Sequence, residues 1–249
     1  MASSDGLYEG YHENWSFKDF GMHTFQGFRA MKAYSDVRSV LDFGCGNGHA
    51  ARLMRSSGFE WYGVEFSRTA YDNYLNEPFF HHGDTTQFSD RQFDLIYSTE
   101  VFEHIPEEDV DAVVADLCRV AAKYLFLTIS LRPSSDNNRY HCTLQSRAWW
   151  EARFTRCGFN VDSAVIDLYQ PLTLKSTRKV MSQWSKFGPT AAQFCENPPY
   201  DLNGEKEFWY FAFRREGVPA PPLPSPEQPW LRRKVVPLIR RALRMNSDA

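Results

Sequence analysis

The feature that most constrains the fold is an apolar stretch that runs directly into three glycines at alternate positions, in residues 37–50 (VRSVLDFGCGNGHA). The apolar and β-branched residues up to Phe43 predict a buried parallel strand, and the residues after Gly48 predict a helix. Glycine permits a positive φ and lets a ligand approach the backbone closely, while the first turn of the helix presents unpaired N–H groups. A strand, a glycine turn and a helix in this order predict a cradle for a nucleotide.

A second predicted strand ends in an acid. Residues 60–65 (EWYGVE) end at Glu65, directly after the helix that follows the glycines. An acid at this position can accept hydrogen bonds from both hydroxyls of a ribose. Two interpretations remain open at this point, because residues 46–51 (GNGHAA) also fit the dinucleotide-binding pattern G-x-G-x-x-A.

Two more predicted strands are each followed by polar residues. Residues 79–88 (FFHHGDTTQF) predict a short third strand followed by Asp84, which could receive the exocyclic amine of an adenine. Residues 92–106 (QFDLIYSTEVFEHIP) predict a fourth strand that runs into a polar edge at Glu100 and a helix with Pro106 in its first position. Ligands bind outside the carboxyl ends of the strands in doubly wound sheets, so this polar edge is expected at the site.

Taken together, these blocks resemble the class I S-adenosylmethionine-dependent methyltransferases over about residues 35–160. The blocks arrive in the family's order and spacing. The resemblance implies that Asp42 lies near the methionine moiety, that Glu65 holds the ribose and that Asp84 meets the adenine. S-adenosylmethionine is then the cofactor, and the implied cofactor-binding residues are Asp42, Gly44, Cys45, Gly46, Gly48, Glu65, Phe66, Asp84, Thr85 and Glu100.

The resemblance also implies the architecture. The expected fold is α/β, a Rossmann-like, doubly wound, seven-stranded and mostly parallel sheet with one antiparallel strand at residues 207–215 and helices on both faces. The residue pattern adds helices at 67–75, 110–122 and 145–154, and strands at 123–131 and 160–169. Ser67 and Ser146 are the expected N-caps, and Gly58 and the Cys157-Gly158 pair are expected at helix ends.

The acceptor side is expected in the long polar loop that follows the strand at 123–131. Loops longer than most connections, placed at such an edge, usually carry function. Candidate catalytic residues are His141, His104 and Glu100, and a structural role stays open for each histidine, because the pair Glu103–His104 recurs in the resembled family whatever the substrate. Candidate substrate-binding residues are Tyr8, Tyr11, Trp15, Arg139, His141 and Trp149, where Trp149 and Trp150 must point to different faces of their helix.

Composition excludes several classes of function. A net charge of −3 argues against nucleic acid as the partner of the whole body. The five cysteines show no C-x-x-C spacing, and no cluster of Asp and Asn lies at the sheet edge, so no metal site is predicted. The first residues are not a secretory signal, and no run of about 18 apolar residues predicts a membrane-spanning helix.

The predicted organisation has three parts. Residues 1–34 are an aromatic, helical segment that could form a lid, and residues 35–216 are the cofactor-binding domain, with an inserted helix and loop at 170–205. Residues 217–249 are a proline-rich linker and a basic amphipathic tail, of which 230–245 could lie on an anionic membrane surface or dock on a protein. The expected location is cytoplasmic, with membrane association through this tail.

The sequence therefore predicts a methyltransferase that moves a methyl group from S-adenosylmethionine to an O or N atom of a small-molecule or sugar-like acceptor, with a glycan included among the expected partners. Three alternatives stay open. A nucleic-acid methyltransferase would use basic residues around 175–186 and the tail, and an NAD-dependent oxidoreductase would explain the glycines and Glu65. A non-catalytic methyltransferase-like scaffold would keep the fold and recruit partners.

Overall fold

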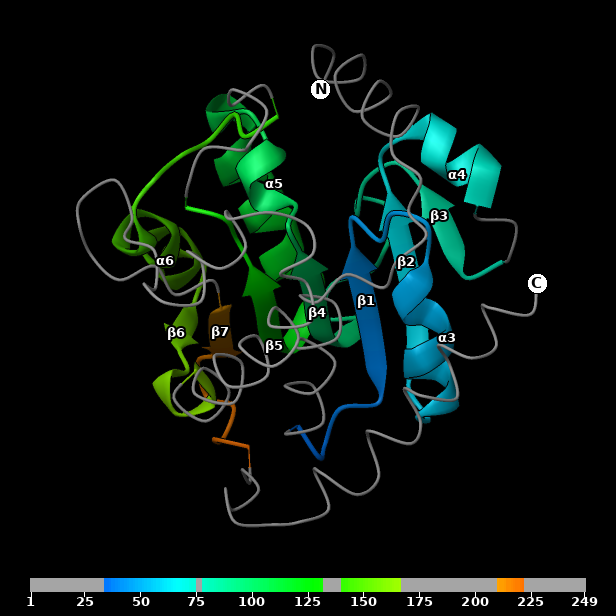
Figure 1. The fold of residues 1–249 in the computed structure, drawn as a ribbon. Coiled ribbons are helices and arrows are strands. Elements are labelled where there is room, and N and C mark those ends of the chain that lie inside the picture. The colour runs from blue at the N-terminus through cyan, green and yellow to red at the C-terminus, as the bar shows by residue number, and fades with distance from the viewer. Residues whose placement is uncertain (1–33, 75–77, 132–139, 167–209, 222–249) are drawn as a thin grey trace, which may run out of the picture.

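The computed structural model describes residues 34–74, 78–131, 140–166 and 210–221, and its centre is one seven-stranded sheet (Figure 1). The strand order is β3-β2-β1-β4-β5-β7-β6. Strand β7 runs antiparallel to β5 and to β6, while β1 to β5 pair in parallel. The expected fold class is confirmed. The strands are β1 (Ser39–Phe43), β2 (Glu60–Glu65), β3 (Phe80–His82), β4 (Phe93–Thr99), β5 (Ala121–Thr128), β6 (Phe159–Val161) and β7 (Tyr210–Arg215).

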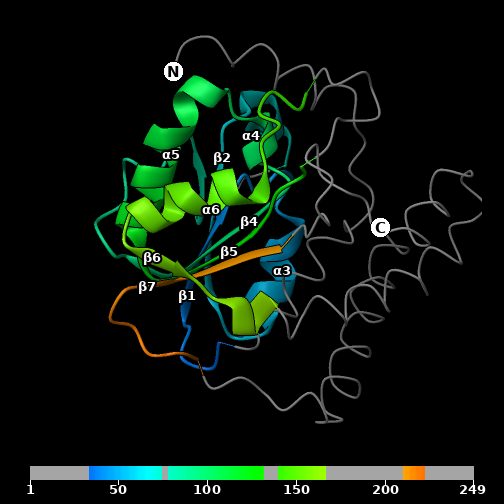
Figure 2. The ribbon, with the colours of Figure 1, turned by 90° about the vertical axis from the view of Figure 1, so that its left-hand side faces the viewer.

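Helices cover both faces of the sheet, as Figures 1 and 2 show. Helices α3 (His49–Ser56) and α4 (Arg68–Tyr74) lie on one face, and α5 (Glu107–Val120) and α6 (Arg147–Arg156) lie on the other. Side chains of β1 alternate between the two cores: Leu41 and Phe43 pack with α5 and α6, whereas Val40 packs with α3. Burial on both faces explains why Val40 and Leu41, which are neighbours on opposite faces of the strand, are both apolar.

The predicted helix ends are confirmed where the structure describes them. The Ser67 hydroxyl accepts a hydrogen bond of 3.1 Å from the Ala70 N–H, and the Ser146 hydroxyl accepts one of 3.2 Å from the Trp149 N–H. Gly58 follows α3 with a φ of 92°, which only glycine adopts at low cost. In α6, Trp150 is buried and Trp149 half-buried, so one of the two indoles faces the core as expected.

Three boundaries differ from the prediction. The strand expected at 160–169 is wrong over 163–166, where a helical turn buries Val165 and Ile166 in the core beside α3, and 167–169 lie outside the described residues. Strand β5 begins at Ala121, directly after α5. Helix α5 ends at Val120, two residues before the predicted end at 122. Pro106, expected in the first helical position, is its N-cap, and the three acids that follow form the first turn at the positive end of the helix.

The five parallel strands β1 to β5 end at the same edge of the sheet, and the loops that leave this edge carry the candidate site. A 3₁₀ turn, η1 (Phe102–His104), lies between β4 and α5. The expected lid at 1–33, the insertion at 170–205 and the tail at 230–245 lie outside the described residues. None of the helices in the described part combines the length and the apolar character that crossing a membrane requires.

Candidate active site

The glycine turn after β1 has a left-handed backbone at each of its three glycines. Gly44, Gly46 and Gly48 have φ values of 72°, 56° and 70°. A Cβ on Gly44 would overlap the Val101 side chain, so this glycine lets the loops after β1 and β4 approach each other. A Cβ on Gly46 would meet no atom within 4 Å, so the middle of the turn faces open space. The turn is shaped as the sequence predicts for a cradle.

The carboxylate of Glu65 braces this turn from the end of β2. Oε2 accepts a hydrogen bond of 2.7 Å from the Gly46 N–H, and Oε1 accepts one of 2.9 Å from the Ser67 N–H. The residue is only 5% exposed. An ionised carboxylate has about four acceptor positions, so these two bonds leave Glu65 the capacity to accept further hydroxyl groups.

A second buried carboxylate belongs to Asp42 in β1, which is 3% exposed. Burial raises its pKa to about 8, and the nearby negative charge of Glu65 adds to the shift. A cation placed beside the two carboxylates would favour their ionised forms and lower this pKa again. The site is therefore electrostatically prepared for a positively charged ligand.

The other predicted cofactor residues lie at the same edge with different surroundings. Phe66 packs edge-on against Phe43, with the ring centroids 5.0 Å apart. The Asp84 carboxylate accepts a hydrogen bond of 3.0 Å from the Thr86 N–H, which closes the turn after β3. The buried hydroxyl of Thr85 donates to Asp116 in α5, so a cofactor contact by Thr85 would come from its backbone. Cys45 is half-buried, and burial raises the pKa of its thiol.

Glu100 follows β4 with a φ of 56°, a left-handed conformation that costs a non-glycine residue of order 1–3 kcal/mol. Two bonds to β5 hold it there: its N–H donates 3.0 Å to the Thr128 carbonyl, and its Oε1 accepts 3.0 Å from the Thr128 hydroxyl. The strained backbone turns the chain sharply at the end of the strand, which is where functional residues concentrate.

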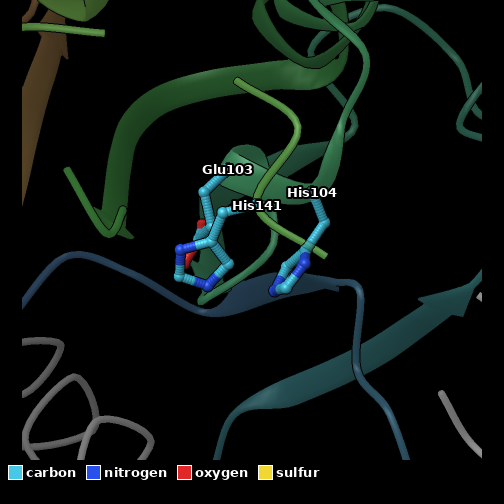
Figure 3. Close-up of side chains that lie close together, drawn as sticks. All are labelled: Glu103, His104 and His141. Carbon is cyan, nitrogen blue, oxygen red and sulfur yellow. The ribbon is translucent and has the colours of Figure 1, made fainter. Parts of the chain in front are cut away.

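Three side chains converge on the acceptor side of this edge (Figure 3). One carboxylate oxygen of Glu103 and one ring nitrogen each of His104 and His141 lie within 4.8 Å of one another. The two imidazole rings meet edge to face, with their centroids 4.9 Å apart. Both histidines are half-buried and Glu103 is fully buried, so the cluster lies at the boundary between the core and solvent.

Backbone contacts hold the segment before α6 against η1. Nδ1 of His104 donates 2.8 Å to the Tyr140 carbonyl, because a carbonyl oxygen can only accept. The Thr143 N–H donates 3.1 Å to the Glu103 carbonyl, and its buried hydroxyl donates 2.6 Å to the Ile105 carbonyl. These bonds bring His141 to His104, although the two lie far apart in the chain.

Glu103 is the member of the cluster that sequence reasoning did not select. Its Oε1 accepts 3.2 Å from the Ser130 N–H, which lies just beyond β5. Burial raises its pKa well above the usual range, and the negative charge of Glu100 raises it further. In the sequence, Glu103 is recognisable only as an acid directly before His104. The packing of η1 shows that its side chain turns inward.

No contact described for the remaining predicted substrate-binding residues links them to the cluster of Glu103, His104 and His141. Trp149 packs between Trp150, at 4.8 Å between ring centroids, and the guanidinium of Arg153. Tyr8, Tyr11, Trp15 and Arg139 lie outside the described residues. Their assignment to substrate binding stays a prediction.

Comparison with known proteins agrees with this geometry. A profile of the family described as "Methyltransferase domain" matches residues 28–175, more than half of the chain. Over 97 residues the chain is 35% identical to a probable tocopherol O-methyltransferase of the chloroplast from Oryza sativa subsp. japonica, covering 34% of this chain and 26% of that protein. The match thus spans about a quarter of the curated relative's length.

Solved structures share the fold at low sequence identity. Magnesium protoporphyrin IX methyltransferase from Synechocystis PCC 6803, with bound S-adenosylmethionine, has a TM-score of 0.50 and 18% identity over 65% of this chain and 88% of that one. Phosphoethanolamine N-methyltransferase 2 from Haemonchus contortus, in complex with S-adenosylmethionine, has a TM-score of 0.51 and 14% identity over 85% of this chain and 60% of that one. With the strand order and the family match, the chain belongs to the class I S-adenosylmethionine-dependent methyltransferases, and S-adenosylmethionine is its cofactor.

Proposed function

We propose that this methyltransferase acts on an oxygen or nitrogen atom of a small-molecule or sugar-like acceptor. The observation that carries the proposal is the division of one sheet edge into two sides. Buried carboxylates of Asp42 and Glu65 lie beside the open glycine turn, and the imidazoles of His104 and His141 lie after the neighbouring strands β4 and β5. A methyl donor bound beside the glycine turn and an acceptor molecule bound beside the two histidines would be neighbours at this edge.

The donor side suits S-adenosylmethionine, which supplies a methyl group on a positively charged sulfur when bound. We assign Asp42 to the positively charged methionine end and Glu65 to the ribose hydroxyls, with Asp84 and Phe66 at the adenine. The raised pKa of Asp42 supports this assignment, because a positive neighbour stabilises the carboxylate that burial otherwise disfavours. Open space at Gly46 supports close approach of the ligand to the backbone.

On the acceptor side, His141 is our candidate for the group that takes a proton from an amine or hydroxyl. A positioned base contributes typically about 10²–10⁴-fold to such a reaction. His104 and Glu100 are assigned to orienting the acceptor or the base. Tyr8, Tyr11, Trp15, Arg139 and Trp149 complete the proposed acceptor-binding set.

A small acceptor is favoured over a nucleic acid by two observations. The net charge of −3 gives the body no general attraction for phosphates. The names of the similar proteins refer to tocopherol, magnesium protoporphyrin IX and phosphoethanolamine, all of them small molecules. We further propose a cytoplasmic enzyme in three parts, 1–34, 35–216 and 217–249, whose segment 230–245 contacts a membrane surface or a protein.

The first experiment is calorimetric titration of the purified chain with S-adenosylmethionine, S-adenosylhomocysteine and NAD. Glu65→Ala is the test variant, and Glu60→Ala, at the exposed start of the same strand, is its control. Micromolar binding of the first two ligands that is lost only in Glu65→Ala supports the donor side. Binding of NAD alone would mean that an oxidoreductase uses the same turn.

The second experiment supplies radiolabelled methyl donor and a panel of phenols, amines, carboxylic acids and glycans. Transfer to one chemical class, reduced at least 10²-fold in kcat by His141→Gln, supports the acceptor side. Transfer to RNA or DNA with a steep dependence on salt would instead support the nucleic-acid alternative. Cofactor binding without methyl transfer to any of these substrates would support the alternative of a non-catalytic, methyltransferase-like scaffold.

A further inference from the structure

We propose that Glu103, His104 and His141 form a binding site for a divalent transition-metal cation of the zinc type. Their three ligand atoms lie within 4.8 Å of one another and come from two segments, η1 and the stretch before α6 (Figure 3). One carboxylate and two imidazoles are a donor set that zinc uses in catalytic sites with an open coordination position. No metal-binding motif is recognisable along the chain here, because α5 and β5 separate the two histidines in sequence.

The distances allow such a site after a small movement. Ligand atoms around tetrahedral zinc are about 3.3–3.4 Å apart, given bonds of about 2.0–2.1 Å. The observed limit of 4.8 Å therefore needs a closure of about 1.5 Å at most, which a rotation of one half-buried imidazole provides.

Glu103 supplies the strongest indication of a missing partner. The residue is 0% exposed, and its Oε1 accepts a hydrogen bond from the Ser130 N–H. Among residues 34–74, 78–131, 140–166 and 210–221, no N–H group or hydroxyl reaches its Oε2, and the group beside the Glu103 carboxyl is a second acid, Glu100, within hydrogen-bonding reach of it. Burying a polar oxygen without a partner is costly, and a bound cation would remove that cost.

His104 is oriented as metal-binding histidines usually are. Its Nδ1–H donates to the Tyr140 carbonyl at 2.8 Å, so the neutral ring carries its lone pair on Nε2. A backbone carbonyl that fixes the tautomer and the ring orientation in this way is a typical outer-shell partner of a metal-binding histidine. The Thr143 bonds to Glu103 and Ile105 place His141 on the same side.

The role of the cation, though not its binding, rests on the proposed function. Three protein ligands leave a position at the sheet edge for an oxygen of the acceptor. A hydroxyl group that coordinates the cation there loses its proton to solvent more readily, because the cation lowers the pKa of the hydroxyl. His141 would then be a ligand, and the metal would replace it as the activating group for hydroxyl acceptors.

The test is titration of the metal-free full-length chain with Co²⁺, followed by its visible d–d absorption and by competition with Zn²⁺. Test variants are His141→Ala and Glu103→Gln. Controls are His82→Ala, an exposed histidine at the end of β3, and Cys142→Ser, the exposed thiol beside His141. Circular dichroism checks that each variant is folded, and His141→Ala, at a half-buried position, serves if Glu103→Gln fails to fold.

One Co²⁺ per chain, displaced by Zn²⁺, weakened at least 10-fold in both test variants and unchanged in both controls, is the expected result. No binding by the folded wild-type chain overturns the proposal. Binding that survives His141→Ala, or that needs Cys142, overturns it as well. S-adenosylmethionine titration of the same samples separates this outcome from failure of the proposed function, because the donor side does not include these residues.

Discussion

The N–H of Gly46 donates a hydrogen bond of 2.7 Å to Oε2 of Glu65, which ties the glycine turn after β1 to the last residue of β2. The same carboxylate also accepts from Ser67, the N-cap of α4. Glu65 therefore holds together two loops of the cofactor side before any ligand binds. Its replacement should affect stability as well as affinity.

We expect Glu65→Ala to lower the free energy of unfolding by at least about 3 kcal/mol, because two backbone donors lose a charged acceptor worth about 1.5–3 kcal/mol each. Glu65→Gln keeps one acceptor oxygen and should lose about half as much. Urea denaturation measures both, with Glu60→Ala as the control, for which a change within about 0.5 kcal/mol is expected. A loss in Glu65→Ala no larger than in the control would refute the bracing role.

Two glycines of the same turn should respond differently to alanine. Gly44→Ala combines a positive φ, worth about 1–2 kcal/mol, with overlap against Val101, worth about 1–3 kcal/mol. Gly46→Ala should lower stability only by the cost of the positive φ, because its Cβ overlaps no atom. It should nevertheless weaken S-adenosylmethionine binding at least tenfold. Thermal unfolding and calorimetry separate the two effects.

Adding Val101→Ala is the control for Gly44→Ala, since it removes the overlapping methyl groups and leaves the φ strain. The double variant should recover part of the lost stability. Equal stability of the single and double variants would show that contact with Val101 does not limit the turn.

Binding of S-adenosylmethionine at pH 7 should release protons from Asp42. The pKa of this carboxyl is raised to about 8, so it is mostly protonated at pH 7 in the empty protein, and a cationic ligand shifts it toward the carboxylate. Calorimetry in two buffers with different ionisation enthalpies measures the release. Asp42→Asn should show close to one proton less per ligand, and identical proton counts for the two proteins would contradict the assignment.

The same carboxyl predicts how stability depends on pH without ligand. Its pKa is near 3.8 when unfolded and about 8 when folded, so the folded chain binds more protons between these values. Its contribution to stability therefore falls as the pH rises from about 4 to about 8. Urea denaturation at pH 5 and pH 8 should show a larger decrease for wild type than for Asp42→Asn, and equal decreases would argue against the shift.

Thr143→Val should test the contact that holds His141 in place. The buried hydroxyl donates 2.6 Å to the Ile105 carbonyl, and valine preserves the shape without the donor. Loss of about 1–2 kcal/mol is expected, with slower methyl transfer. The control is Thr155→Val, where an exposed hydroxyl donates 3.1 Å to the Ala152 carbonyl and its loss should cost under about 0.5 kcal/mol.

Local patterns were enough to predict most of the sheet. The apolar run ending at Phe43, the glycines and Glu65 each depend on neighbours close in sequence, and the structure places them as expected. The strand predicted beyond Val161 was wrong because Val165 and Ile166 are β-branched in a helical turn, where burial in the core overrides their strand propensity.

The acceptor side depended on contacts that no local pattern contains. Glu103 meets His141 because the chain before α6 returns to η1, where the Tyr140 carbonyl accepts from His104 and the Thr143 N–H donates to the Glu103 carbonyl. The left-handed φ of Glu100 was also hidden, since glutamate rarely adopts it and the bonds to Thr128, a residue distant in sequence, help to maintain it. Both features arise from packing between segments distant in sequence.

The strand order has a consequence for how acceptor specificity can evolve in such a chain. The donor-side acids Asp42, Glu65 and Asp84 belong to β1, β2 and the loop after β3, whereas the cluster of Glu103, His104 and His141 belongs to segments that follow β4 and β5 on the other half of the sheet. Substitutions that select a new acceptor can therefore accumulate on one half while the donor-binding half stays intact. One inherited donor-binding half can in this way support enzymes with very different acceptors.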